Sequence, residues 1–522
     1  MIHRSKFPDI SLPDIAFAPF ISERWSEYGD KPALIDAVSG RTLTYADLAQ
    51  AVPRAAAGLA EHGFRQGEVL AILSPNIPEY AIAFHACVLI GGVVTTLNPI
   101  YTEQEIEHQL RDAGAKVLVT VPPLLQRALP AARAAGVREV FVFGEAPGAT
   151  PFARLLSSTA AVPPALFDPR QQLLALPYSS GTTGLPKGVM LTHANVTANI
   201  LQSELTDWGN AQDVYIAVLP FFHIYGLVLI LNACLRVGAT LVTLPRFEFA
   251  QFLQAMQDYG VTRAPLVPPI VLALAKQPLV ENYDLSKLRS IGCGAAPLGA
   301  EIMAACAERL NCTVRQGYGM TEASGVTHSC LTPLSKPIAG TVGVLVASTE
   351  AKIIDVETGA ALPPGERGEI LIRGPQIMLG YLNRPEASAS SLDAEGWLHT
   401  GDIGYADAEG QFFVVDRLKE LIKFKGYQVA PAEIEALLLT HPAIADVAVI
   451  PIPDDEAGEV PKAFVVRKGE IDAGEVVDFV AQRLAPYKKP RRVEFVAAIP
   501  KSPSGKILRR TLVAQERERS TG

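Results

Sequence analysis

Short apolar runs with the length of β-strands recur along the sequence and alternate with helical patterns. They lie at Val69–Leu73, Lys116–Val121, Leu173–Leu176, Val214–Leu219, Thr240–Leu244 and Arg289–Ile291. Strands that alternate with helices over such a length indicate α/β layers built on parallel sheets. The pattern Thr102-x-x-Glu105 predicts that one of the intervening helices begins with a capping box.

The pattern changes twice in the last third of the chain. From Lys352 to Val415 short strands are separated by Gly and Pro turns, which predicts a smaller β-rich subdomain. After Asp416 a compact α+β unit follows, with a helix opening at Pro431. We therefore expect a large N-terminal domain over residues 1–416 and a small C-terminal domain over residues 417–522.

The composition is that of a compact globular protein, because 49% of the 522 residues are hydrophobic and 19% are charged. The net charge of −8 argues against a nucleic-acid-binding protein, which carries a basic face. From Arg417 to the end, 18 Lys and Arg stand against 15 Asp and Glu, so this part suits an anionic partner. The six cysteines lack metal-ligand spacing and the N-terminus lacks an apolar signal region, which predicts reduced thiols and a cytoplasmic location.

The segment Val214–Leu235 contains no Asp, Glu, Lys or Arg and is long enough to span a membrane. Pro220 and His223 interrupt it, so a buried strand, a turn and a buried helix (Leu227–Leu235) explain it better than a transmembrane span. A histidine buried between two apolar elements is also a candidate for the wall of a pocket.

A loop rich in hydroxyl groups follows the run Leu173–Leu176 and precedes helix-start residues at Thr192. It offers hydroxyls, glycine-freed amides and one cation, the groups that bind a polyphosphate, at Ser179, Ser180, Gly181, Thr182, Thr183, Gly184 and Lys187. It is not a Walker A loop, because Pro186 stands where the second glycine belongs and Gly188 where a Ser or Thr would bind magnesium.

Four further segments follow this loop in a fixed order. They are Gln316–Glu322 (QGYGMTE), Gly396–Asp402 (GWLHTGD), Asp416–Lys423 (DRLKELIK) and Pro500–Lys506 (PKSPSGK). With the loop, they resemble the adenylate-forming superfamily of acyl-CoA synthetases, luciferases and peptide-synthetase adenylation domains over essentially the whole chain. The amino-acid sequence at residues 220–225, 294–298 and 421–433 is most similar to that of bacterial 4-coumarate/cinnamate-CoA ligases.

The resemblance implies an AMP-forming ligase that uses ATP, Mg²⁺ and coenzyme A and converts a carboxylic acid through an acyl-adenylate into a thioester. It implies that Ser179, Ser180, Gly181, Thr182, Thr183 and Lys187 hold the β- and γ-phosphates, and that Gln316, Gly317 and Tyr318 line the adenine slot. Thr321 would contact the α-phosphate, Glu322 would hold Mg²⁺, and Asp402 would bind the ribose with Arg417 nearby.

The resemblance also implies two active arrangements of a mobile C-terminal domain. In one, Lys506 enters the active site and bridges the carboxylate and the α-phosphate. In the other, reached by rotation about a hinge at Lys419, a second face carries the CoA step. That face would hold the catalytic Lys423, the AMP contact Gln428, and the CoA contacts Lys425 and Gly426, with Arg246 as a further CoA contact from the large domain.

The resemblance places the acid between the turn at His223 and Tyr225 and the strand end at Gly292, Gly294 and Ala295. Since no Asp or Glu occurs between Pro220 and Leu231 to pair with an ammonium group, amino acids are disfavoured as substrates. A cinnamate-type acid and a medium- or long-chain fatty acid both remain open. An enzyme that loads a carrier protein, a luciferase and a membrane-associated binding protein are further alternatives, and either a monomer or a homodimer is compatible with the sequence.

Overall fold

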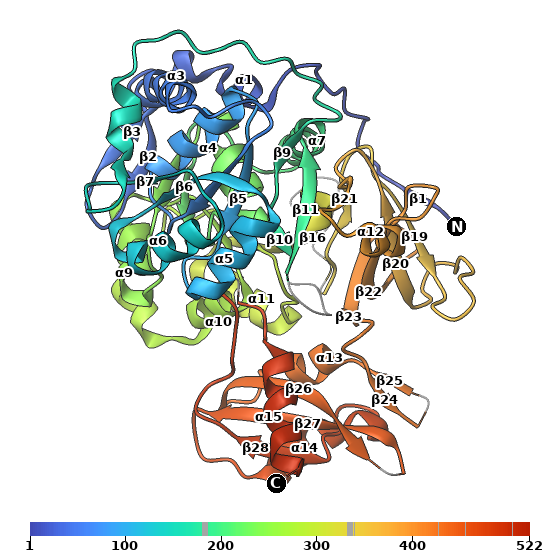
Figure 1. Cartoon of the computed structure of the whole chain (residues 1–522). Helices are drawn as coiled ribbons and strands as arrows, with labels where there is room; N and C mark the ends of the chain where they lie inside the picture. Colours follow the sequence, from blue (N-terminus) through green and yellow to red (C-terminus); the bar gives the residue numbers. More distant parts are fainter. Residues whose placement is uncertain are drawn as a thin grey trace.

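The computed structural model describes residues 1–179, 186–330, 338, 340–425, 427–454, 456–503 and 505–521. Figure 1 shows a large domain, coloured from blue through green and yellow to light orange, and a smaller orange and red domain below it that is built from the last part of the chain. The predicted fold class is confirmed: a mixed α/β N-terminal domain with a β-rich part, and a small α+β C-terminal domain. Each of the six predicted apolar runs forms a strand.

The first sheet of the large domain has a parallel centre, in the order β10-β11-β9-β5-β4-β6-β7-β8, with β21 paired to β11. Its strands are β4 (Val69–Leu73), β5 (Val93–Leu97), β6 (Ala115–Thr120), β7 (Glu139–Val142), β8 (Thr150–Pro151), β9 (Leu173–Ala175), β10 (Tyr178–Ser179), β11 (Lys187–Thr192) and β21 (Gly380–Tyr381). The central strand β4 is buried along its whole length, as expected for a parallel strand covered on both faces.

Helices cover this sheet on both sides. On one side α5 (Glu103–Asp112) and α6 (Leu125–Ala134) form an apolar cluster with β4, β5 and β6. The predicted capping box is confirmed, because Thr102 and Glu105 bond reciprocally at the start of α5. A larger core joins the other side to the second sheet through α1 (Phe17–Ser22), α2 (Trp25–Tyr28), α3 (Tyr45–Glu61), α4 (Glu79–Leu89) and α7 (His193–Glu204).

The second sheet runs in the order β18-β17-β16-β15-β14-β12-β13-β2-β3, and its strands from β16 to β2 are parallel. These strands are β2 (Pro32–Asp36), β3 (Thr42–Thr44), β12 (Val214–Ala217), β13 (Thr240–Thr243), β14 (Arg263–Leu266), β15 (Ser290–Cys293), β16 (Thr313–Met320), β17 (Gly325–Ser329) and β18 (Val344–Leu345). The connecting helices include α8 (Ala233–Val237), α9 (Phe249–Asp258), α10 (Pro268–Lys276) and α11 (Ala300–Leu310). Because the strands are parallel, the segments that follow β12, β14, β15 and β16 meet at one edge of the sheet, where α/β proteins bind ligands.

The chain turns sharply after β12, and the buried side chain of Asn76 holds this turn. Its amide donates to the carbonyl oxygens of Ala217 and Leu219, and its oxygen accepts the N–H of Phe221. Gly226 is required here, since a Cβ atom would lie 2.0 Å from the carbonyl oxygen of Pro220. The turn therefore brings His223 to the edge of the sheet.

The helix after this turn differs from the expected single helix over Leu227–Leu235. Residues Tyr225–Asn232 wind as a π-helix, and α8 continues from it. Segments of π-helix are frequent at functional sites, and apolar periodicity does not distinguish them from an α-helix. Within the described ranges no helix has the length and hydropathy that crossing a membrane requires.

The predicted β-rich subdomain is an antiparallel sheet. Its order is β1 (His3–Arg4), β19 (Glu350–Ile354), β20 (Gly368–Arg373), β22 (Leu398–Ala406) and β23 (Phe412–Arg417), and α12 (Pro385–Ser391) lies between β21 and β22 in the chain. The sequence did not indicate that the N-terminal strand β1 would join this sheet.

The C-terminal domain has a sheet in the order β25-β24-β27-β26, with β28 beside β27. It consists of β24 (Ile422–Phe424), β25 (Tyr427–Val429), α13 (Pro431–Leu438), β26 (Ile444–Asp454), β27 (Gly458–Arg467), α14 (Ala473–Ala481), β28 (Arg492–Phe495) and α15 (Arg509–Thr521). The helix predicted at Pro431 is confirmed as α13. A contact joins the two domains: Lys276 Nζ, at the end of α10, donates to the carbonyl oxygen of Leu439 over 2.6 Å, just after α13.

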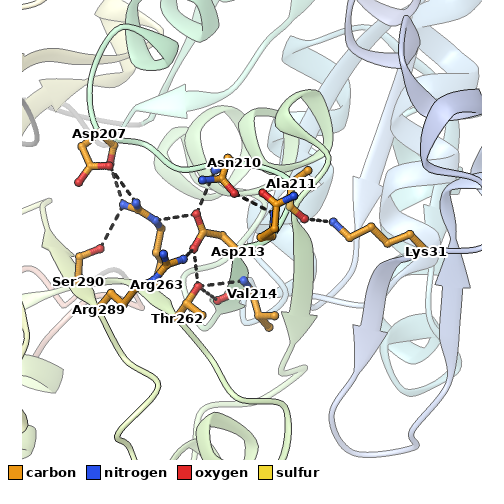
Figure 2. A network of polar contacts seen from close by, with 11 residues as sticks. Lys31, Asp207, Asn210, Ala211, Asp213, Val214, Thr262, Arg263, Arg289 and Ser290 are labelled. Atoms are coloured by element: carbon orange, nitrogen blue, oxygen red, sulfur yellow. Dashed lines mark hydrogen bonds and ion pairs between the residues drawn. The ribbon is translucent and has the colours of Figure 1, made fainter.

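A polar network ties the strands of the second sheet together at their N-terminal ends (Figure 2). The side chain of Asp213, just before β12, has no exposed surface and pairs with Arg263 over 3.0 Å and with Arg289. It also accepts the hydroxyl of Thr262 over 2.7 Å and the backbone N–H of Asn210 over 3.0 Å. One buried carboxylate thus connects β12, β14 and β15 at the edge opposite to His223.

Replacement of Asp213 by Asn should lower the free energy of unfolding by about 3 kcal/mol, because it leaves the partly buried Arg263 without its buried charge partner. Burial alone would raise the pKa of Asp213, but the bonds from Thr262 and Asn210 and the two arginines hold it below its usual value. Its stabilising effect should therefore be complete above a pH of about 4 and be lost as the pH falls further.

Thermal unfolding of the wild type and of Asp213→Asn across this pH range measures the effect. The control is Asp207→Asn, which removes a 57% exposed partner of the same Arg263 and should cost less than about 1 kcal/mol. A constant difference between wild type and Asp213→Asn down to low pH would contradict the assignment.

Candidate active site

A carboxylate and a guanidinium group from neighbouring strands face the end of β16. Asp402 on β22 lies opposite Arg417 on β23, with Arg417 Nε 3.4 Å from Asp402 Oδ1. The hydroxyl of Tyr318, on β16, donates to Asp402 Oδ2 over 2.5 Å. Burial raises the pKa of Asp402, and Arg417 and Tyr318 partly offset this rise. The carboxylate is held in place while it keeps lone pairs for further donors such as hydroxyl groups.

Tyr318 belongs to the segment predicted to line an adenine slot, which the structure places along β16. Gln316 is buried, and its Oε1 accepts the backbone N–H of Leu298 over 2.8 Å. Its side chain therefore holds the loop that follows β15. Gly317 and Tyr318 are partly exposed beside it.

Thr321 and Glu322 begin a short 3-10 helix directly after β16. The backbone of Glu322 is fixed, since its carbonyl oxygen accepts the N–H of Met378 over 2.9 Å. Its side chain is fixed as well, because the hydroxyl of Tyr381 donates to Glu322 Oε1 over 2.9 Å. The second carboxylate oxygen has no hydrogen bond among the described residues.

The hydroxyl-rich loop connects the two strands of a hairpin, where Ser179 on β10 lies opposite Lys187 on β11. Lys187 Nζ lies 4.1 Å from the centre of the Tyr381 ring. A strand, β11, separates the loop from the start of α7, which the sequence pattern did not indicate. Ser180, Gly181, Thr182 and Thr183, which were predicted to bind phosphate, lie outside the described residues.

The C-terminal domain delivers Lys506 to the same region on a tight turn. The backbone N–H of Lys506 donates to Ser502 Oγ over 3.1 Å, and its carbonyl oxygen accepts the N–H of Ser502 over 2.8 Å. Gly505 has a φ of +77°, and a Cβ atom there would lie 3.1 Å from Val267 and 3.3 Å from Pro269. The absent side chain of Gly505 thus lets the turn approach the loop between β14 and α10.

Lys506 is partly buried among charged groups at the junction of the two domains. Burial lowers the pKa of Lys506 and Arg417 lowers it further, whereas Asp402 and Glu322 raise it. Burial, helped by the charge of Lys506, lowers the pKa of His223 to about 3, so His223 is neutral at ordinary pH. Five predicted site residues therefore share one electrostatic environment: Lys506, Arg417, Asp402, Glu322 and His223.

The turn of Lys506 is anchored inside its own domain by Arg509, the first residue of α15. Arg509 Nη1 donates to Glu420 over 2.7 Å, and Nη2 donates to Glu435 over 2.6 Å. Burial raises the pKa of Glu435 to about 7, although Arg509 opposes the rise. Arg509 therefore links the turn of Lys506 to Glu420, in the segment between β23 and β24.

The predicted acyl-binding residues also come together. His223 Nδ1 accepts the backbone N–H of Tyr225 over 3.2 Å, which leaves the proton of the neutral ring on Nε2. The hydroxyl of Tyr225 donates to the carbonyl oxygen of Gly292 over 3.2 Å, and its ring packs on Gly294, where a Cβ atom would lie 3.0 Å away. Ala295 follows with a φ of 71°, a region that favours glycine. The space that Gly294 frees is taken by Tyr225.

Three of the residues predicted for the CoA step, Lys423, Lys425 and Gln428, lie elsewhere, at the hairpin of β24 and β25. Lys423 and Gln428 are paired across this hairpin and both are exposed. Lys425 is also exposed and forms an ion pair with Glu456. Gly426 lies outside the described residues. The structure thus leaves this hairpin facing solvent, whereas Lys506 of the same domain lies beside Asp402, Arg417 and Glu322.

Two other predicted residues stand apart from the site. Arg246 is exposed after β13, and Lys419 is exposed in the turn between β23 and β24. Conversely, Tyr381 touches both Lys187 and Glu322 but was not named from the sequence. It belongs to a two-residue strand, which is too short to produce a pattern.

Lys506 on its turn therefore lies beside the pair of Asp402 and Arg417 at the junction of two domains. The AMP-binding enzyme family matches residues 21–382, and the AMP-binding enzyme C-terminal domain matches residues 433–506. The chain belongs to the AMP-binding enzyme family.

Relatives and solved structures agree with this membership. The chain is 45% identical to 4-coumarate--CoA ligase 1 from Solanum tuberosum over 99% of this chain and 96% of the relative. It is 45% identical to 4-coumarate--CoA ligase from Pinus taeda over 98% and 97%. Among solved structures, ATP-bound MatB from Rhodopseudomonas palustris is 28% identical with a TM-score of 0.86 over 96% and 99% of the two chains. The anthranilate CoA ligase AuaEII in complex with anthranoyl-AMP is 27% identical with a TM-score of 0.87 over 97% and 98%. The resemblance drawn from the sequence motifs is confirmed.

Replacement of Gly294 by Ala should displace the Tyr225 ring, because the new Cβ atom would meet it at 3.0 Å. We expect a loss of about 1–3 kcal/mol in the free energy of unfolding. Thermal unfolding of the single variants and of the double variant Gly294→Ala/Tyr225→Ala forms a double-mutant cycle. In the Tyr225→Ala background the cost of Gly294→Ala should fall to near zero, and an undiminished cost would contradict this packing.

Proposed function

We propose that the protein is an ATP-dependent, AMP-forming acid–thiol ligase of the 4-coumarate–CoA ligase type. It activates the acid as an acyl-adenylate with release of pyrophosphate, and it then transfers the acyl group to the thiol of coenzyme A with release of AMP. Full-length relatives at 44–45% identity carry the name 4-coumarate--CoA ligase.

The observation that carries this proposal is the position of Lys506. A lysine on a Gly/Ser/Pro turn would ordinarily be solvated, yet burial lowers its pKa beside Arg417, Asp402 and Glu322. Desolvation of a cation is costly unless an anion compensates it. An attacking carboxylate and an α-phosphate, both negative, are the groups that a lysine there would bridge.

In the first step an oxygen of the acid attacks the α-phosphorus of ATP, and the bond to pyrophosphate breaks. Such a reaction needs positioning and charge stabilisation more than covalent help. Lys506 stabilises the charge on the attacking and α-phosphate oxygens, and Thr321 donates to the α-phosphate. His223, neutral with its proton on Nε2, donates to the acid without adding a second charge.

Other residues hold the rest of the nucleotide. Asp402 accepts the ribose hydroxyls beside Arg417, and Gln316, Gly317 and Tyr318 form the adenine side. The hydroxyl-rich loop binds the β- and γ-phosphates through Ser179, Ser180, Gly181, Thr182, Thr183 and Lys187.

Glu322 suits Mg²⁺ because a carboxylate oxygen is a hard ligand. No cluster of three or more His, Cys, Asp or Glu that could cage a metal occurs in the described part of the chain. A lone carboxylate fits Mg²⁺, which is commonly held by one or two carboxylates together with substrate phosphates. Bound there, Mg²⁺ would neutralise phosphate charge.

The second step uses the other face of the C-terminal domain. We place the domain division at residues 1–416 and 417–522, with the hinge at Lys419. Rotation brings the hairpin of β24 and β25 to the nucleotide, where Lys423 and Gln428 contact the adenylate. Lys425, Gly426 and Arg246 then bind the anionic CoA.

A planar hydroxycinnamate is favoured over a fatty acid by the relatives' names and by the surroundings of Tyr225. The hydroxyl of Tyr225 is bonded to Gly292 and its ring packs on Gly294, so it gives the acid a rigid aromatic wall. A medium- or long-chain fatty acyl-CoA synthetase is the second candidate, since the neighbouring Leu227 and Leu229 are apolar and buried.

The test is AMP release by the purified protein with ATP, Mg²⁺ and CoA over 4-coumarate, cinnamate, benzoate and C6–C16 fatty acids. We expect 4-coumarate to give the highest kcat/KM. Highest activity with a fatty acid supports the second candidate, and acid-dependent pyrophosphate release without any acyl-CoA supports loading of a carrier protein instead.

Replacement of Lys506 by Ala should reduce pyrophosphate release by two orders of magnitude or more, because it removes a donor worth about 3 kcal/mol in the transition state. The control is Lys501→Ala in the same motif, whose ammonium pairs with Asp446 over 2.6 Å. Pyrophosphate release by Lys506→Ala at the rate of the control would contradict the role of Lys506.

Replacement of Lys276 by Met should separate the two steps. The bond from Lys276 to the carbonyl oxygen of Leu439 holds the domains in the arrangement with Lys506 in the site. Its loss should slow pyrophosphate release roughly tenfold. CoA transfer from supplied acyl-AMP should not slow, since that step needs the other arrangement. The exposed Lys287→Met is the control, and equal slowing of both steps would argue against alternation.

A further inference from the structure

Tyr381 lies between two elements of the site and belongs to neither. Its strand β21 pairs with β11, so that Val189 lies opposite Tyr381. The backbone N–H groups of Leu379 and Leu382 donate to the carbonyl oxygens of Met190 and Gly188 over 3.0 Å and 2.8 Å. The side chain is 7% exposed. Tyr381 is therefore fixed against the second strand of the hydroxyl-rich hairpin.

The two ends of the Tyr381 side chain meet groups of opposite charge. The hydroxyl donates to Glu322 Oε1 over 2.9 Å, and the ring face receives Lys187 Nζ at 4.1 Å from its centre. The hydroxyl is the donor in this contact, because a carboxylate oxygen can only accept.

These contacts keep a cation and a carboxylate apart while orienting both. Within the described ranges, neither Lys187 nor Glu322 forms an ion pair with another side chain. A direct pair between them would neutralise both charges, whereas a π face attracts an ammonium group and leaves its charge intact. One oxygen of Glu322 is occupied by the hydroxyl, and the other is left for a further partner.

We propose that Tyr381 is a positioning residue that separates Lys187 from Glu322, so that the lysine reaches the terminal phosphates of ATP and the carboxylate reaches the accompanying divalent cation. This rests on the proposed function, because the two charged groups are those assigned to the phosphates and to Mg²⁺. Tyr381 acts through them and touches no reacting atom.

Two substitutions divide the roles of the hydroxyl and the ring. Tyr381→Phe keeps the ring under Lys187 and removes the donor to Glu322. We expect the Mg²⁺ concentration that half-saturates ATP binding to rise roughly tenfold, because loss of a hydrogen bond to a charged group weakens binding by about that factor. ATP affinity at saturating Mg²⁺ should be unchanged. Tyr381→Leu also removes the ring, so ATP affinity should fall several-fold even at saturating Mg²⁺.

The measurement is calorimetric titration of the full-length protein with ATP at a series of Mg²⁺ concentrations, followed by KM for ATP and for 4-coumarate. The matched control is Tyr45→Phe, which removes a buried hydroxyl that donates to the carbonyl oxygen of Ala239 over 2.7 Å in the large core. It should lower the thermal stability and leave the Mg²⁺ dependence unchanged.

The outcomes separate this proposal from the function on which it rests. If the wild type does not bind ATP with Mg²⁺, the proposed function fails. If the wild type binds ATP and Tyr381→Phe has the same Mg²⁺ dependence as the wild type, the positioning role is overturned. A fall in ATP affinity at saturating Mg²⁺ that is equal in Tyr381→Phe and Tyr381→Leu would also overturn it, because the ring would then have no role of its own.

Discussion

The site is organised around the approach of two cations, Lys506 and Arg417, in a partly desolvated place. Besides burial, Arg417 lowers the pKa of Lys506, whereas Asp402, Glu322 and Glu420 raise it, and Glu420 is itself paired with Arg509. Lys187 lies nearby on the ring of Tyr381. Three positive groups, Lys506, Arg417 and Lys187, therefore face the carboxylates of Asp402 and Glu322. Asp402 is already bonded to the hydroxyl of Tyr318 and to Arg417. A multiply charged anion completes such a set of charges better than any protein side chain present there.

The scaffold places these charges by simple means. Parallel strands deliver their following loops to one edge, and the buried network of Asp213 fixes the strands at the opposite edge, away from the chemistry (Figure 2). At the site itself, single side chains hold the loops: Asn76 holds the turn after β12, and Gln316 holds the loop after β15. The network that stabilises the second sheet therefore lies at one end of its strands, and the candidate site lies at the other end.

The sequence predicted the strands, the capped helix and the β-rich subdomain because each depends on local patterns that survive in the fold. It also predicted which residues meet near Asp402, but only through the resemblance, since the turn of Lys506 reads as an exposed loop on its own. Other features arise from contacts between distant segments and have no local signal. Gly294 makes room for Tyr225 from another part of the chain, Tyr381 contacts Lys187 across a strand pair, and the π-helix after Tyr225 has the same apolar pattern as an α-helix.

Lys506 and the exposed hairpin of β24 and β25 belong to one domain, and Arg509 ties the lysine's turn to Glu420 close to that hairpin. A lysine carried on such a body leaves the site only when the whole body turns. In the alternation proposed for the two chemical steps, the surface that receives the thiol substrate reaches the nucleotide only after this body has turned. The order in which substrates bind and products leave then follows from the arrangement of the two domains. Steady-state kinetics would show it as a compulsory order.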